Sequence, residues 1–222
     1  RGRIGPPQVS VTAFAAPTAA IGFWAERLAS RGVSTQPLAD RFDENGLSFS
    51  DPDGLQLEIV GSASPAGEPW KAGPVAVDYA LRGFRSVTLA EEGYEKTARL
   101  LTDVMGFSPA GSDQNRYRYQ AGGGENFAGL VDVLCVPDAK HGGMGAGAVH
   151  HVAFRTPDDV RQAAWRREIV RAGLNVSPIM DREYFHSIYY REPGGVLFEI
   201  ATSTPGFTAD EPAERLGTKL ML

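Results

Sequence analysis

Two short apolar segments near the end of the chain contain side chains that bind metal ions well. The first, residues 149–154, carries the neighbouring histidines His150 and His151, and the second, residues 193–200, carries Glu199. A carboxylate in the middle of an apolar strand is costly to bury unless a partner compensates its charge. A divalent metal ion shared with a histidine would be such a partner, because imidazole and carboxylate groups both coordinate first-row metals. These residue types therefore predict part of a metal site.

The alternation of side chains along a β-strand indicates which histidine is the ligand. His150 shares a strand face with Val152 and Phe154, which suits packing against a helix. His151 lies on the opposite face, and Glu199 likewise lies opposite its apolar neighbours. We therefore expect His151 and Glu199 to point into the concave side of one sheet. The alternatives are two ordinary histidines at a strand end, and a glutamate that faces solvent or pairs with a buried arginine.

The elements that must position these residues belong to a β-α-β-β-β unit that recurs with a period of roughly 70 residues. Three amphipathic helices mark the repeat, and each ends at a glycine that tolerates the left-handed conformation, at Gly32, Gly106 and Gly173. Their apolar faces are Ile21, Trp24, Ala25 and Leu28; Tyr94, Ala98, Leu101 and Met105; and Trp165, Ile169 and Ala172. Thr156, as a cap, and Pro157 predict the start of the third helix.

Strands are expected on both sides of each helix. Those before the helices are 9–14, 84–89 and 151–155, and those after them are 47–50, 55–60, 116–120, 129–136, 175–180, 185–191 and 196–201. The first and third units share a Pro-x-Gly turn and a following strand, so that Glu58 stands where the third unit has Glu199. Because no histidine begins the first unit, the pairing of histidine with glutamate carries the metal prediction, rather than the glutamate alone.

This pattern predicts an α+β fold of tandem β-α-β-β-β modules. The expected segments are a module at 1–62, a linker at 63–78, modules at 79–137 and 145–205, and a tail at 206–222. One module makes half of a curved sheet and two close it, so three modules leave one apolar sheet face open to solvent. We therefore expect a fourth module before Arg1, with residues 1–62 as the second module of an N-terminal pair.

Composition narrows the classes of partner. The 222 residues are 42% hydrophobic and 22% charged, with a formal net charge of -5 and no long basic run, which disfavours nucleic acid and anionic membranes as partners. No apolar stretch is long enough to span a membrane. Cys135 is the single cysteine, so an internal disulfide is excluded, which fits a cytoplasmic protein. The glycine-rich loops at 122–124 and 142–147 lack a phosphate-loop lysine, which disfavours nucleotide binding.

The repeat resembles the vicinal oxygen chelate (glyoxalase/extradiol dioxygenase) superfamily, over nearly the whole chain. The last module most closely resembles the ring-cleaving dioxygenases that open hydroquinones. The segments that carry this resemblance are Val149-His150-His151-Val152-Ala153-Phe154, Asp181-Arg182-Glu183-Tyr184-Phe185, Ser187-Ile188-Tyr189-Tyr190-Arg191-Glu192-Pro193-Gly194-Gly195 and Phe198-Glu199-Ile200-Ala201-Thr202. The resemblance implies Fe(II), with Mn(II) as the other candidate, held by two histidines and a glutamate. His151 and Glu199 would be two of these ligands, and the third would lie upstream of Arg1.

The resemblance also implies roles for three further residues. Tyr189 would border the metal and donate a hydrogen bond to a ligand or to bound oxygen, although it could equally be an ordinary half-buried strand residue. Arg182 would hold a phenolate or superoxide as a fixed positive charge, or else be exposed to solvent. His150 would serve as an acid–base group, because its charge changes near neutral pH.

The function implied is oxidative opening of hydroquinone-like or other dihydroxylated aromatic rings with O2. The partners would be a small aromatic substrate and O2, and a homo-oligomer is allowed. Two alternatives share the fold. One is a metal-free protein that sequesters small molecules, which is favoured by Arg85 standing where relatives often have a histidine. The other is a glyoxalase-like isomerase or lyase that uses Zn(II) or Ni(II).

Overall fold

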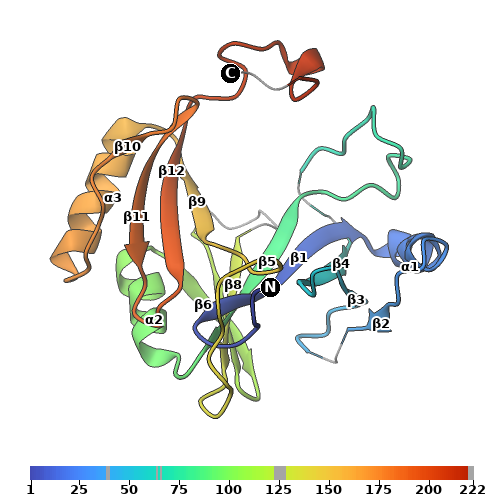
Figure 1. Cartoon of the computed structure of the whole chain (residues 1–222), viewed down its shortest axis with the longest axis horizontal. Coiled ribbons are helices and arrows are strands. Elements are labelled where there is room, and N and C mark those ends of the chain that lie inside the picture. The colour runs from blue at the N-terminus through green and yellow to red at the C-terminus, as the bar shows by residue number, and fades with distance from the viewer. Residues whose placement is uncertain (39–40, 64, 66, 123–128, 220–222) are drawn as a thin grey trace. The chain divides into compact units, whose positions relative to one another are not determined.

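The computed structural model describes residues 1–38, 41–63, 65, 67–122 and 129–219 (Figure 1). The chain forms two compact units: unit 1 is residues 1–150 with 193–195, and unit 2 is residues 151–192 with 196–222. None of the described helices has the length and apolar character needed to cross a membrane. Residues 123 and 124 of the expected glycine-rich loop lie outside the described residues.

Unit 1 is built on one eight-stranded sheet to which two repeats contribute. The order of its strands is β2-β3-β4-β1-β5-β8-β7-β6. The first repeat provides β1 (Gln8–Pro17), α1 (Ile21–Ala29), β2 (Gln36–Pro37), β3 (Gly46–Ser50) and β4 (Gln56–Ser62). The second provides β5 (Phe84–Glu91), α2 (Glu95–Arg99), β6 (Ser108–Asp113), β7 (Arg116–Gln120) and β8 (Leu130–Cys135). The repeats join where β1 and β5 pair antiparallel at the centre of the sheet.

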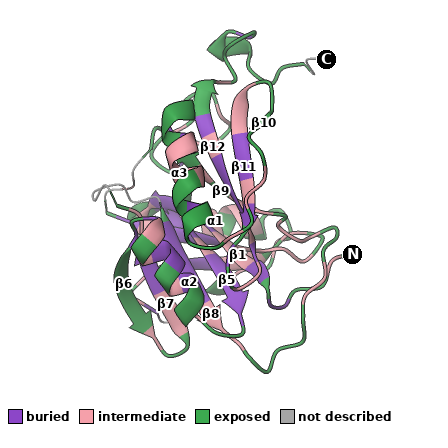
Figure 2. Cartoon of the chain, turned by 90° about the vertical axis from the view of Figure 1, so that its left-hand side faces the viewer, coloured by how far each residue is buried: buried purple, intermediate pink, exposed green. Residues whose placement is uncertain are grey.

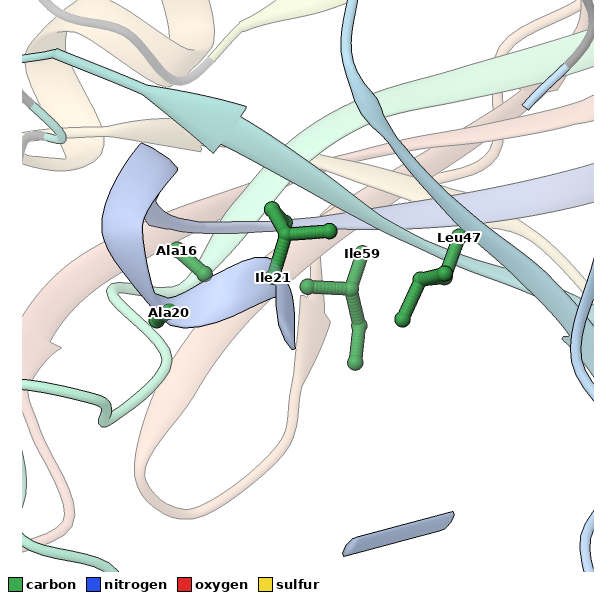
Figure 3. Packing of buried hydrophobic residues seen from close by; sticks show 5 residues of the cluster. All are labelled: Ala16, Ala20, Ile21, Leu47 and Ile59. Carbon is green, nitrogen blue, oxygen red and sulfur yellow. The ribbon is translucent and has the colours of Figure 1, made fainter. Parts of the chain in front are cut away.

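Helix α1 packs through the face that its sequence predicts. Figure 3 shows Ile21 of α1 beside Ile59 of β4, and both are buried in one cluster with Ala20 and with Leu47 of β3. Trp24, Ala25 and Leu28 pack against this cluster. The helix is followed by Gly32 with a positive φ of 74°, as expected for a glycine stop.

The second helix differs from its prediction in its hydrogen-bond pattern. Only Glu95–Arg99 is α-helical, and Leu100–Val104 continues as a π-helix. Leu101 and Met105 are nevertheless buried as predicted. The apolar periodicity therefore located the buried face but carried no information on the wider helical turn.

Unit 2 contains the third repeat, in a four-stranded sheet of order β10-β11-β12-β9. Its elements are β9 (Val152–Thr156), α3 (Asp159–Arg171), β10 (Met180–Asp181), β11 (Phe185–Arg191) and β12 (Leu197–Pro205). Strands β9 and β12 are parallel, and β11 and β12 are antiparallel. Helix α3 covers one face of this sheet, where the buried parts of β11 and β12 lie (Figure 2). The predicted α+β fold of β-α-β-β-β modules is confirmed, while the exact module boundaries stay predictions.

Two local predictions for unit 2 are wrong. The cap of α3 is Asp158, whose carboxylate accepts a hydrogen bond from the Arg161 amide, because Thr156 is still the last residue of β9. The strand expected over 175–180 is reduced to β10 and one isolated bridge between Val176 and Tyr190.

Candidate metal site

The three repeats each place a carboxylate at the same position of their last strand. These residues are Glu58 in β4, Asp132 in β8 and Glu199 in β12, and all are at most 5% exposed. Their register partners on the parallel first strand are Ala13, Thr88 and Ala153. A buried carboxylate needs a compensating partner, so the group that faces each one decides what it can do.

Arginines neutralise the two repeat carboxylates of unit 1, Glu58 and Asp132. Arg41 makes a bidentate contact with Glu58, with a distance of 2.9 Å between Nη1 and Oε1. Arg118 binds both oxygens of Asp132, at 2.7 Å from Nε and 2.9 Å from Nη2. Burial lowers the pKa of Arg118. Its hydrogen bonds to Asp132 and Glu44 raise the pKa by more, so that it lies above the usual value for arginine. Carboxylates paired on both oxygens with permanent cations are poor metal ligands.

In unit 2 the carboxylate meets a histidine instead. His151 directly precedes β9, and its Nε2 lies 2.7 Å from Oε2 of Glu199. The histidine side chain is 34% exposed and that of the glutamate is 4% exposed, so the pair is buried at one end and accessible at the other. The structure thus brings together the two residues that strand alternation placed on one face, while their role as ligands stays a prediction.

The second oxygen of Glu199 is held by two hydroxyl groups from β11. The Tyr189 hydroxyl donates a hydrogen bond of 2.8 Å to Oε1, and the Ser187 hydroxyl donates to the same oxygen. Ser187 is fully buried and was missed by sequence reasoning. The same alternation that selects His151 puts Ser187 and Tyr189 on one face of β11, and this signal could have found it.

Arg182 lies beside this cluster. Its guanidinium carbon is 5.5 Å from the centre of the Tyr189 ring, and the residue is exposed in the short loop between β10 and β11. The His151 ring meets the Tyr189 ring edge-on, with 5.9 Å between their centres. His150 is exposed and is the last residue of unit 1 before unit 2 begins, and its role stays a prediction.

The face of the unit 2 sheet opposite α3 holds the candidate site. It carries Arg155, Ser187, Tyr189 and Glu199, since these residues alternate with the buried positions under the helix.

The position of Arg85 bears on the metal-free alternative. His151 lies two residues before Ala153, the register partner of Glu199. In the second repeat, the residue two positions before Thr88, the register partner of Asp132, is Ser86 and not Arg85. Arg85 lies at an irregularity of the β1–β5 pairing and donates to Glu44 at 2.8 Å. Burial is the main cause that lowers its pKa. Arg85 therefore belongs to the ion pairs of unit 1 and is no argument against a metal in unit 2.

The donor set of unit 2 fits part of an iron site. An imidazole nitrogen and a carboxylate oxygen face each other, which are two of the three donors of a facial triad. Within the described residues no group of three His, Cys, Asp or Glu side chains could hold a metal ion. The other two histidines of the chain, His186 and His141, pair with Asp159 and Glu92 respectively.

Comparison with known proteins agrees with this architecture. A family model described as Glyoxalase/Bleomycin resistance protein/Dioxygenase superfamily matches residues 83–200. MhqO of Bacillus subtilis (strain 168), a predicted ring-cleaving dioxygenase by name, is 42% identical over 222 residues, which are 100% of this chain and 70% of MhqO. The chlorohydroquinone/hydroquinone 1,2-dioxygenase of Sphingobium indicum is 37% identical over 226 aligned positions, covering 99% of this chain and 69% of that enzyme.

Solved structures give the same fold. The crystal structure of a predicted dioxygenase from Bacillus subtilis superposes with a TM-score of 0.93 at 42% identity, covering 100% of this chain and 70% of that one. Glyoxalase I from Zea mays superposes with a TM-score of 0.65 at 16% identity, covering 92% of this chain and 70% of that one, which supports the fold alone. Fold, family match and relatives agree: this chain belongs to the Glyoxalase/Bleomycin resistance protein/Dioxygenase superfamily.

Proposed function

We propose that this protein is an Fe(II)-dependent ring-cleaving dioxygenase that opens hydroquinone-like or other dihydroxylated aromatic rings with O2. The observation that carries the proposal is the pair of His151 and Glu199. Of the three equivalent buried carboxylates, Glu199 is the one that meets a histidine, whereas Glu58 and Asp132 meet arginines. The names of the relatives, one of them a chlorohydroquinone/hydroquinone dioxygenase, support the reaction class.

His151 through Nε2 and Glu199 through Oε2 would hold the metal. When bound, Fe(II) would supply the open positions and the electron density that bring a phenolic oxygen and O2 into reaction. A third ligand is proposed from outside the described residues; this chain spans 70% of MhqO. Mn(II) is the other metal that this donor set suits.

The remaining side chains act on substrate and protons. Arg182, held beside Tyr189, would stabilise the ionised hydroxyl of the ring as a fixed positive charge. The Tyr189 hydroxyl donates a hydrogen bond to Glu199, which orients that carboxylate. His150 is the proposed acceptor of the second phenolic proton.

The test is metal content together with oxygen uptake. After anaerobic loading with Fe(II), we expect the wild-type protein to retain iron and to consume O2 when hydroquinone is added. His151→Ala and Glu199→Ala should each abolish both properties. Two matched controls in unit 2, His186→Gln and Glu168→Ala, should abolish neither, since these side chains pair with Asp159 and Arg171. Iron retention and full activity in either site variant would rule the assignment out.

One observation favours a second candidate, a metal-free protein that binds small aromatic molecules. His151 Nε2 and Glu199 Oε2 lie 2.7 Å apart, so each already provides a polar partner for the other. Tight binding of a phenolic ligand by metal-stripped protein, with no oxygen uptake after Fe(II) loading, would favour this function. A glyoxalase-like isomerase would instead be active with Zn(II) or Ni(II) and would need no O2.

A further inference from the structure

The two oxygens of Glu199 have different surroundings. Oε2 faces His151, whereas Oε1 accepts hydrogen bonds from the hydroxyls of Ser187 and Tyr189. We propose that Ser187 is a positioning residue of the metal site, which together with Tyr189 fixes Oε1 so that Oε2 stays directed toward His151. The inference rests on the proposed function, because it gives Glu199 the role of a ligand.

The register of the sheet makes this arrangement specific. Tyr189 lies directly opposite Glu199, and Ser187 lies opposite Ala201, one position further along the same face. Both hydroxyls therefore reach Glu199 from the same strand, β11. Ser187 is fully buried and Glu199 is 3% exposed, so water has little access to replace a lost donor.

The equivalent positions of unit 1 support the role. On β7, Arg118 lies opposite Asp132 as Tyr189 lies opposite Glu199, and Arg116 occupies the place of Ser187. Both arginines bind Asp132, with Arg116 Nη1 at 3.1 Å from Oδ2. These two strand positions thus hold the repeat carboxylate in the second and third repeats. Arginines cancel its charge, whereas hydroxyls orient it and leave the charge available for a metal ion.

The chemistry predicts what happens without Ser187. A carboxylate held by one donor rather than two rotates more freely, so Oε2 spends less time in the position that binds the metal. Groups that orient a metal ligand typically contribute about 10- to 100-fold to metal affinity. We expect a loss of that size from Ser187→Ala, and a similar loss from Tyr189→Phe, with Glu199 still present in both.

The experiment is an anaerobic titration of the metal-free protein with Co(II), followed by its visible absorption. The variants are Ser187→Ala, Tyr189→Phe and Glu199→Ala. Ser203→Ala is the matched control, because its hydroxyl donates to the Thr156 carbonyl and not to Glu199. We expect weaker binding and an altered Co(II) spectrum for Ser187→Ala, no binding for Glu199→Ala, and wild-type behaviour for Ser203→Ala. Thermal melting of the metal-free forms shows whether each variant is folded.

The outcomes separate this inference from the proposed function. If Glu199→Ala loses Co(II) while Ser187→Ala keeps wild-type affinity and spectrum, the role of Ser187 is overturned and the metal site stands. If the wild-type protein binds no Co(II), or Glu199→Ala binds it normally, the metal site and this role are both overturned. Should Ser187→Ala not fold, Tyr189→Phe decides, because it removes the other donor to Oε1 from a side chain that is only partly buried.

Discussion

A single side chain opposite a carboxylate changes what that carboxylate can do. Guanidinium groups convert Glu58 and Asp132 into structural ion pairs, while the imidazole of His151 leaves Glu199 as a candidate ligand. Alternation along the strands was enough to place His151 and Glu199 together from sequence. Ser187 could not be found as easily, because a small polar residue in a strand has no characteristic role until its hydrogen-bond acceptor is known.

His186 should make the stability of unit 2 depend on pH. Its Nδ1 lies 2.6 Å from Asp159 on α3, its Nε2 lies 4.0 Å from Asp181 on β10, and the bond to Asp159 is the main cause that raises its pKa. A raised pKa means that the folded protein binds the proton more tightly than the unfolded chain. The stabilisation is therefore complete below the unfolded pKa of about 6.5 and is lost as pH rises through the folded value.

The measurement compares urea unfolding of the wild-type protein and His186→Gln. The variant should be less stable than the wild type at low pH, near pH 5.5, and should approach it at about pH 9, where the histidine is neutral in both states. Asp159→Asn should show the same pH dependence. A difference that grows as pH rises would contradict this prediction.

At the scale of the elements, the apolar face of α1 and the glycine stops followed from sequence spacing. The π-helical turn at 100–104 and the short β10 did not, because both depend on backbone hydrogen bonds that side-chain patterns do not encode. The start of α3 was misplaced by two residues, since Thr156 and Asp158 are both good caps and only the length of β9 decides between them.

Gln162 should be needed to attach α3 to its sheet. It is fully buried, and its amide donates to the carbonyls of His186 on β11 and Ile200 on β12. Gln162→Ala leaves both acceptors buried without this donor, at an expected cost of about 1–3 kcal/mol in unfolding free energy. Chemical denaturation measures it, with the exposed neighbour Arg161→Ala as the control. Equal stability of the two variants would show that the bonds are dispensable.

On the scale of the whole molecule, the same repeat is used in two ways. Unit 1 joins two repeats through β1 and β5 and fills the carboxylate positions with ion pairs. Unit 2 keeps one repeat whose corresponding positions carry hydroxyls and a histidine. The tandem fold was predictable because helices, stops and strands recur together. The distribution of ion pairs was not, because Arg41, Glu44 and Arg118 meet only after the sheet has formed.

Arg118 should be the most costly of these arginines to lose. It is 5% exposed and binds both Asp132 and Glu44, so Arg118→Ala leaves two buried carboxylates short of a partner. We expect a loss of about 3–5 kcal/mol in unfolding free energy. Arg118→Lys should recover little, because an ammonium cannot reproduce a bidentate contact with two carboxylates. The exposed Arg31→Ala is the control, and a similar small effect in all three variants in urea unfolding would refute the prediction.

The arginines opposite the carboxylates of unit 1 also constrain its evolution. Giving the second repeat a metal site would require a histidine in place of Ser86 and the removal of Arg118 from Asp132. Either order of change passes through an unfavourable intermediate: one lacks a free carboxylate, and the other buries an uncompensated charge. A repeat whose carboxylate is paired with arginines is therefore held in its structural role, since no single substitution gives it a metal site.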